Sequence, residues 1–321
     1  DNTDKYWFLL RIALEKKGYS FHTKVEEDFS QYTYIFFNNL YDDSLIGKIT
    51  RLIRKNNSYN IFKEILSRNI HNRIVLFLTE PDIVMPWNYK KDNHKNLSKI
   101  FTWKKDLVDN KKYFYYLIPF GGRKNLSKKI HFHEKKLIMN ISSNKFSKIE
   151  GEHYSTRRKI IKYLDKNHCE NFDLYGSDWG RNGLFENLKR FIKYSQFDFT
   201  KYKTYRGKVK NKTQIISKYK FIICYENIRY DNFITEKIFD VFVNNSVPIY
   251  LGADNIHKYI PENTFIDRRK FDSDSELIRY ITDIDEVSYN IYIKNIEEFL
   301  SSNAYVKFKN KYFVETILAN L

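Results

Sequence analysis

The sequence predicts an α/β protein built from two Rossmann-like domains that face each other across a cleft. Short apolar runs typical of buried parallel strands alternate with segments of helical spacing along the 321 residues. The alternation begins again after a polar, glycine-containing stretch at 121–125. This length is too great for one ordinary domain, and a hydrophobic content of 42% excludes disordered and fibrous chains. We expect one domain at 1–125, a second at 126–321, and a ligand site at the carboxyl ends of the strands.

In the first domain, helical spacing comes before a set of strands. The expected elements are a helix, a strand, a helix and three strands, in this order: Trp7–Leu14, Tyr34–Phe37, Ile61–Leu66, Ile74–Leu78, Ile100–Trp103 and Tyr113–Phe120. The run Ile74–Leu78 is apolar throughout, as expected of a strand that is covered on both faces.

The second domain repeats the alternation. Its expected strands are Leu137–Ile141, Phe172–Tyr175, Phe221–Tyr225 and Val247–Leu251. Helices are expected at Ser155–Leu164 and from Thr235, and the chain from about Ser288 onward has the spacing of two further helices.

Charge is distributed unevenly along the chain. The formal net charge is +17, with +10 in residues 90–136, +11 in 137–220 and −5 in 221–321. A basic middle suits a polyanionic ligand, which could be a nucleotide, a nucleic acid or an anionic membrane surface, although biased codon usage explains it equally well. The two cysteines fit a reducing compartment. The longest apolar run falls short of the roughly 18 residues that a membrane span needs.

The densest group of candidate site residues lies between 220 and 237. Glu226 and Asn227 follow an expected strand directly and so lie at its carboxyl end. Thr235 is placed to cap a helix whose first turn holds Glu236 and Lys237. A helix start with a lysine favours a phosphate, and the glutamate suits sugar hydroxyls or a developing cation. The alternative is a capped helix in which Glu236 only complements the helix dipole.

Two further places carry candidate chemistry. Glu80 follows the apolar strand 74–78 and comes before Pro81, where a carboxylate can act as a general base, although an ordinary turn residue is the alternative. Arg157 and Arg158 begin a helix in the basic middle, where a guanidinium can bind phosphate or simply face water.

Other polar groups are weaker candidates. His131 and His133 could bind a metal from one strand face, but no third ligand lies at a useful spacing, and a solvated strand is the preferred interpretation. The acidic pairs at 272–274 and 283–285 lie near helix starts, where capping acids are common.

The segment Lys220–Lys237, followed by Ser246–Gly252, resembles the donor-site pattern of the α-1,3/4-fucosyltransferases, glycosyltransferase family 10, including its bacterial members. The resemblance continues through Tyr259–Pro261 and Thr264–Ile266. Looser matches upstream extend it to about Arg73–Phe271, among them Leu76–Pro81, Ile100–Trp103 and Ile118–Phe120.

The resemblance implies a GT-B architecture with an acceptor domain at 1–125 and a GDP-fucose domain at 126–321, whose last helix, near Tyr305–Leu318, crosses back to the first domain. It implies that Glu80 is the catalytic base and that Glu236 holds fucose and stabilises the reacting carbon. Four residues are expected to bind the donor: Arg157 (Arg158 if the register moves by one), Glu226, Asn227 and Lys237. The chain departs from the family in having Phe233 where a tyrosine is usual.

The implied reaction is inverting transfer of fucose from GDP-β-L-fucose to a hydroxyl of an N-acetylglucosamine or glucose unit in a glycan such as lipopolysaccharide. Neither a metal nor another cofactor is expected. We expect a cytoplasmic location, with peripheral contact at the inner face of the membrane. The alternatives are transfer of another GDP-sugar and, from a different class, binding of nucleic acid by the basic, aromatic-rich surface.

Overall fold

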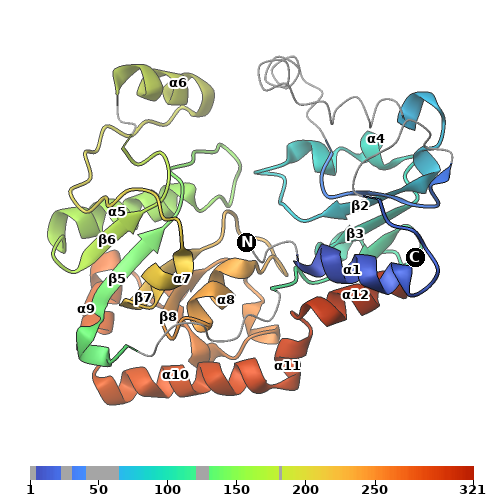
Figure 1. Cartoon of the computed structure of the whole chain (residues 1–321). Helices are drawn as coiled ribbons and strands as arrows, with labels where there is room; N and C mark the ends of the chain where they lie inside the picture. Colours follow the sequence, from blue (N-terminus) through green and yellow to red (C-terminus); the bar gives the residue numbers. More distant parts are fainter. Residues whose placement is uncertain (1–4, 23–30, 41–64, 121–129, 181–182) are drawn as a thin grey trace. The chain divides into compact units, whose positions relative to one another are not determined.

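The computed structural model describes residues 5–22, 31–40, 65–120, 130–180 and 183–321 (Figure 1). The chain forms two compact units, one made of Asp1–Gly121 with Phe308–Leu321 and the other of Gly122–Lys307. Each unit contains a parallel sheet, which confirms the predicted α/β class. The expected boundary at 125 lies outside the described residues. Among the described helices, none is long and apolar enough to cross a membrane.

Unit 1 contains a four-stranded parallel sheet in the order β1-β2-β3-β4. Its strands are β1 (Ile35–Phe37), β2 (Ile74–Leu78), β3 (Lys99–Thr102) and β4 (Tyr113–Tyr115). Its α-helices of known bounds are α1 (Lys5–Glu15), α4 (Lys91–His94) and α12 (Asn310–Leu318), and short 3-10 helices lie at His71–Arg73, Pro86–Tyr89 and Lys105–Leu107.

Strand β2 is completely buried because its alternate side chains enter two separate cores. Val75 and Phe77 pack in a cluster with α1 and α12, while Leu76 packs in a cluster on the opposite face. The rings of Trp7 and Phe313 meet edge to face with centroids 5.9 Å apart, so the two ends of the chain close one face of this sheet (Figure 1).

Unit 2 contains a five-stranded parallel sheet in the order β6-β5-β7-β8-β9. Its strands are β5 (Lys136–Ile141), β6 (Phe172–Tyr175), β7 (Tyr219–Tyr225), β8 (Val247–Leu251) and β9 (Ile266–Asp267). Its α-helices are α5 (Tyr154–Asn167), α6 (Leu184–Tyr194), α7 (Lys212–Ile216), α8 (Glu236–Phe242), α9 (Asp274–Asp283), α10 (Glu286–Ser301) and α11 (Asn303–Val306). Short 3-10 helices lie at Phe132–Glu134, Ile256–Lys258, Glu262–Thr264 and Arg268–Lys270.

The strand order of unit 2 reverses between β5 and β7. From β5 the chain passes outward to β6 and then returns to place β7 on the other side of β5, where Asn140 pairs with Ile223. Ligands of open α/β sheets bind outside the carboxyl ends of the strands at such a reversal. The residues that follow β7 therefore lie where a ligand of this sheet is expected.

Some elements expected from the sequence differ in length or number from those in the structure. Strand β4 ends at Tyr115, because the chain then leaves the sheet and the Phe120 amide donates to the Phe308 carbonyl at 2.8 Å. The end of the chain contains three helices in place of two, since Ser302 caps a new helix, α11, after α10. Most of the helix expected at Ile61–Leu66 lies outside the described residues.

The strand interpretation of His131–His133 is wrong. Residues Phe132–Glu134 form a 3-10 helix, and the side chains of His131 and Glu134 cap it reciprocally. A capped turn of this kind satisfies the free amides at a helix start, which explains the polar residues here without a ligand.

Candidate site at the carboxyl end of β7

Glu226 is the centre of the candidate site. It follows β7 directly, its side chain is completely buried, and its amide donates to the Leu251 carbonyl at 2.7 Å. One carboxylate oxygen accepts the Thr235 amide at 2.9 Å and the Thr235 hydroxyl at 2.8 Å. The other accepts the Lys237 ammonium at 2.6 Å. A buried carboxylate therefore ties the end of β7 to the start of α8.

Lys237 completes this arrangement from the first turn of α8. Its Nζ also donates to the Thr235 hydroxyl at 3.0 Å, and 29% of its side chain remains exposed. Burial works against its charge, but the neighbouring carboxylates of Glu226 and Glu236 outweigh burial and raise the pKa of Lys237. The ammonium thus stays charged across the physiological range, on a side chain that is partly exposed.

Glu236 is partly buried beside Lys237. Burial alone would raise its pKa, yet the charges of Lys237 and then Lys212 lower the pKa of Glu236 below its usual value. The side chain is therefore an ionised carboxylate at neutral pH, and it lies next to a cation that a second carboxylate holds in place.

The two neighbouring arginines of α5 have different environments. Arg157 is 5% exposed, and its Nη2 donates to the carbonyls of Tyr225 at 2.5 Å and Glu226 at 3.2 Å. Burial lowers the pKa of Arg157. Arg158 turns to another side, where it donates to the Lys145 carbonyl and to the Gln196 side chain at 2.6 Å. Only Arg157 joins the end of β7.

Asn227 lies partly exposed after Glu226, and its carbonyl accepts the His153 amide at 3.0 Å. Among the described residues, its side-chain amide forms no hydrogen bond, so that amide is available to a ligand. Arg157, Glu226, Asn227, Glu236 and Lys237 are thus brought together within unit 2, as five of the six expected site residues.

His153 is a member of this site that the sequence does not reveal. It comes immediately before α5 and is 6% exposed. Burial, and then the charge of Arg157, lower the pKa of His153 to about 4, so its ring is neutral at physiological pH. A single histidine at a helix start has many ordinary explanations, and it is the backbone contacts with Asn227 and Arg157 that connect His153 to the site.

Gly252 has a steric role at the same place. A Cβ atom on this residue would lie 2.4 Å from the Tyr250 hydroxyl and 2.7 Å from Cγ of Glu226. The close approach of the β8 end to Glu226 therefore requires glycine.

The segment between Asn227 and Thr235 is held by side-chain hydrogen bonds. The Asn232 side-chain carbonyl accepts from the Tyr259 hydroxyl at 2.6 Å and from the Asn255 amide at 3.0 Å. Phe233 is 1% exposed, so its ring packs inside the unit.

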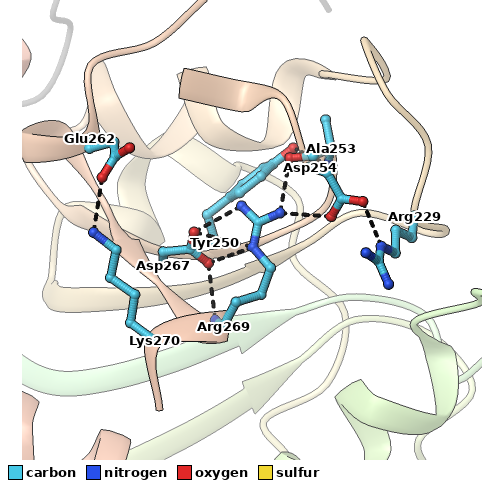
Figure 2. A network of polar contacts seen from close by, with 8 residues as sticks. All are labelled: Arg229, Tyr250, Ala253, Asp254, Glu262, Asp267, Arg269 and Lys270. Atoms are coloured by element: carbon cyan, nitrogen blue, oxygen red, sulfur yellow. Dashed lines mark hydrogen bonds and ion pairs between the residues drawn. The ribbon is translucent and has the colours of Figure 1, made fainter. Parts of the chain in front are cut away.

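A network of charges joins the ends of three neighbouring strands of unit 2 (Figure 2). Asp254 pairs with Arg229 at 2.7 Å and with Arg269 at 2.9 Å, and Arg269 also pairs with Asp267 at 2.8 Å. The Tyr250 hydroxyl accepts the Ala253 amide at 3.1 Å in the same group. These contacts link the loops after β7 and β8 to β9 and limit their independent movement.

Glu80, the sixth expected site residue, belongs to unit 1. It follows β2 by two positions, is partly exposed, and its carbonyl accepts the Tyr89 hydroxyl at 2.9 Å. Its position at the carboxyl end of a central strand suits an acid or base. No group of three or more His, Cys, Asp or Glu side chains suited to a metal occurs within the described residues.

Comparison with known proteins finds a family match that lies mostly in the second unit. Residues 153–313 match the family model "Glycosyltransferase family 10 (fucosyltransferase) C-term". An α-(1,4)-fucosyltransferase of Arabidopsis thaliana is 39% identical over 79 residues, 24% of this chain and 20% of the relative. An α-(1,3)-fucosyltransferase of Helicobacter pylori is 32% identical over 120 residues, 35% of this chain and 25% of the relative. The aligned part is thus a quarter or less of each relative.

Solved structures confirm the fold. An α1,3-fucosyltransferase superposes with a TM-score of 0.50 at 17% identity, covering 92% of both chains. A DNA-modifying β-glucosyltransferase gives 0.57 at 13% identity, covering 97% of this chain and 92% of the other. Both show the GT-B architecture. The family match spans half of this chain and contains the whole β7–α8 cluster, and on that evidence the protein belongs to glycosyltransferase family 10, the fucosyltransferases.

Proposed function

We propose that this protein transfers L-fucose from GDP-β-L-fucose to a hydroxyl of an N-acetylglucosamine or glucose unit in a cell-surface glycan, with an α-1,3 linkage. The observation that carries the proposal is the Glu226–Lys237 pair at the end of β7, which lies inside the region matched to the fucosyltransferase family. Lipopolysaccharide is the acceptor we propose, by analogy with bacterial members of the family.

The donor half of the mechanism follows from the cations of unit 2. A departing nucleoside diphosphate develops negative charge, and preorganised cations stabilise that charge. Lys237 supplies an ammonium on a partly exposed side chain, and Arg157 supplies a guanidinium of which only Nη2 is used by the protein within the described residues. Asn227 offers its side-chain amide to the nucleotide. The ionised Glu236 holds fucose hydroxyls and stabilises positive charge at the sugar carbon.

Glu226 has a positioning role in this mechanism. Because its carboxylate is completely buried and both oxygens are used by Thr235 and Lys237, it directs the ammonium and does not contact the nucleotide. This differs from the expectation that Glu226 itself binds the donor. The sequence places a glutamate after the strand, and its complete burial supports a positioning role.

The acceptor half uses Glu80 as general base. The acceptor oxygen forms a bond to C1 of fucose as the bond between C1 and the β-phosphate oxygen breaks, and the acceptor proton passes to the Glu80 carboxylate. A single displacement of this kind converts the β-linked donor into an α-linked product. General bases contribute on the order of a hundredfold to ten-thousandfold to the rate.

We also propose that transfer needs no metal, since Lys237 and Arg157 supply positive charge for the leaving group. The activity is then expected to persist in EDTA, and complete loss that Mn²⁺ restores would overturn this part. The proposed place of action is the cytoplasm, with peripheral contact at the inner face of the membrane. Cell fractionation checks this location.

The donor assignment is tested by calorimetric titration of GDP-fucose, GDP-mannose and UDP-galactose against the wild type and Lys237→Ala. We expect selective binding of GDP-fucose that is lost in Lys237→Ala. Lys270→Ala is the matched control, because it also removes the lysine of a Lys–Glu pair, at 3.0 Å, but an exposed one. Preferential binding of GDP-mannose would indicate another GDP-sugar, and equal or absent binding of all three would reject the donor site.

A further inference from the structure

Helix α6 of unit 2 has its apolar side turned outward. Leu184, Leu188, Phe191 and Ile192 are between 52% and 78% exposed. At about 100° per residue they occupy one stripe roughly 100° wide. A helix that packs in the usual way would turn this stripe toward the core.

The inward side of α6 is the polar one. Asn187 is 1% exposed and accepts the Asp198 amide at 2.7 Å, and the Arg190 guanidinium lies 4.9 Å from the centroid of the Phe146 ring. Tyr194 stacks on the same Phe146 ring at 6.3 Å. The helix is thus attached to unit 2 through Asn187, Arg190 and Tyr194, and its apolar stripe is a surface feature.

The apolar surface continues beyond the helix. Phe197 is 55% exposed and Phe199 is 54% exposed. Phe191 contacts Phe197 with centroids 6.1 Å apart, and Phe197 contacts Phe199 at 5.4 Å. We call this continuous surface the α6 patch, and it consists of Leu184, Leu188, Phe191, Ile192, Phe197 and Phe199.

The charge around the α6 patch is strongly positive. Residues 183–220 contain 11 lysines and arginines and only 2 acidic residues, of which Asp198 is buried. Lys189 and Lys193 are exposed on α6 itself, and Lys201 and Lys203 are exposed shortly after Phe199. An apolar stripe with lysines beside it is the pattern of helices that lie in the interface of an anionic bilayer.

We propose that the α6 patch docks on an anionic lipid surface, inserting its leucine, isoleucine and phenylalanine side chains among the acyl chains while the surrounding lysines contact the headgroups. A second copy of the chain fits less well, because pairing two α6 patches would bring two basic surfaces together. The proposal names the surface for the peripheral membrane contact suggested above, and it does not depend on which sugar is transferred.

Cosedimentation with vesicles tests the proposal. The wild type is expected to bind vesicles of equal parts phosphatidylcholine and phosphatidylglycerol, and to bind pure phosphatidylcholine vesicles weakly. The double variant Leu188→Gln with Ile192→Gln is expected to lose about tenfold or more in partitioning, because two inserted side chains are removed. High salt should weaken binding of the wild type, since exposed charges are screened.

The chain offers a matched control on α10. Val287 and Ile291 have the same spacing as Leu188 and Ile192 and comparable exposure, 69% and 56%. Helix α10 runs along the end of unit 2 away from α6 (Figure 1). Val287→Gln with Ile291→Gln should therefore bind vesicles as the wild type does. Titration with GDP-fucose and circular dichroism verify that both double variants remain folded.

A second measurement reports insertion directly. Phe191→Trp is expected to show quenching by brominated acyl chains in the anionic vesicles, because the indole enters the bilayer. Three results would overturn the proposal: no binding of the wild type to anionic vesicles, undiminished binding of the α6 double variant, or concentration-dependent dimerisation that the α6 double variant abolishes. The last result would assign the patch to a second copy of the chain.

Discussion

The ends of β2 and β7 present the same local pattern and different environments. Each is a buried apolar strand followed within two positions by a glutamate. Glu80 remains partly exposed after β2, whereas the Glu226 side chain is completely buried after β7 and bonded to Thr235 and Lys237. This difference supports the proposed roles, in which Glu80 exchanges a proton with the acceptor and Glu226 orients Lys237. The role of a glutamate after a strand depends on what the following loop folds over it.

Substitution of Glu80 should produce the largest effect on catalysis. Glu80→Gln keeps size and polarity but removes the base, and we expect kcat to fall by about a hundredfold to ten-thousandfold. GDP-fucose affinity and the unfolding midpoint should remain unchanged, because the side chain is partly exposed and lies in unit 1. Steady-state kinetics measures kcat, and calorimetry measures the GDP-fucose affinity and the unfolding midpoint. A near-normal kcat would show that Glu80, like Glu226, has only a structural role.

Breaking the Glu226–Lys237 pair should reduce stability as well as donor binding. Lys237→Ala leaves Glu226 buried without its cation, and we expect a loss of about 3 kcal/mol in the free energy of unfolding. Glu226→Gln should cost less, because the amide oxygen still accepts from Thr235 and the partly exposed Lys237 can reach water. Urea unfolding of both variants measures the difference. Equal losses of unfolding free energy in the two variants would contradict the argument from burial, in which Glu226 is completely buried and Lys237 is partly exposed.

His153 adds a pH dependence to the β7 end. Because its pKa is lowered from 6.5 to about 4, the unfolded chain takes up this proton first as the pH falls. The contribution to stability is complete above about pH 6.5 and is lost progressively toward about pH 4, by up to about 3 kcal/mol. Urea unfolding across this range compares the wild type with His153→Asn. An identical pH dependence of the two proteins would exclude the effect.

The smallest expected effects concern the tyrosines near the two strand ends. The Tyr89 hydroxyl donates to the Glu80 carbonyl at 2.9 Å, and the Tyr259 hydroxyl donates to Asn232 at 2.6 Å. Each Tyr→Phe change should cost about 1 kcal/mol of stability. Tyr89→Phe should lower kcat at unchanged GDP-fucose affinity, whereas Tyr259→Phe should weaken that affinity. If Tyr89→Phe instead weakened GDP-fucose affinity and Tyr259→Phe lowered kcat, the loops after β2 and β7 would not serve the acceptor and donor halves of the reaction separately.

The sequence predicts four of the five strands of unit 2, and helices α5 and α8, because their determinants are local. Apolar runs indicate β7 and β8, and Thr235 indicates the start of α8, where its hydroxyl accepts the Lys237 amide at 3.4 Å. The expected β4 is too long, since nothing local shows that the chain leaves the sheet at Tyr115 to meet Phe308. Likewise, the apolar spacing of α6 does not show that the apolar side faces outward.

The sequence by itself determined the α/β class, the family resemblance and the group of residues around Glu226, because strands, caps and ordered motifs depend on neighbours along the chain. Only the tertiary structure decided that Arg157 and not Arg158 joins the end of β7, that His153 lies beside them, and that Glu226 is sealed from solvent. Hydrogen-bond partners and burial arise between segments distant in sequence. These contacts, more than residue type, set the charge and orientation of each side chain.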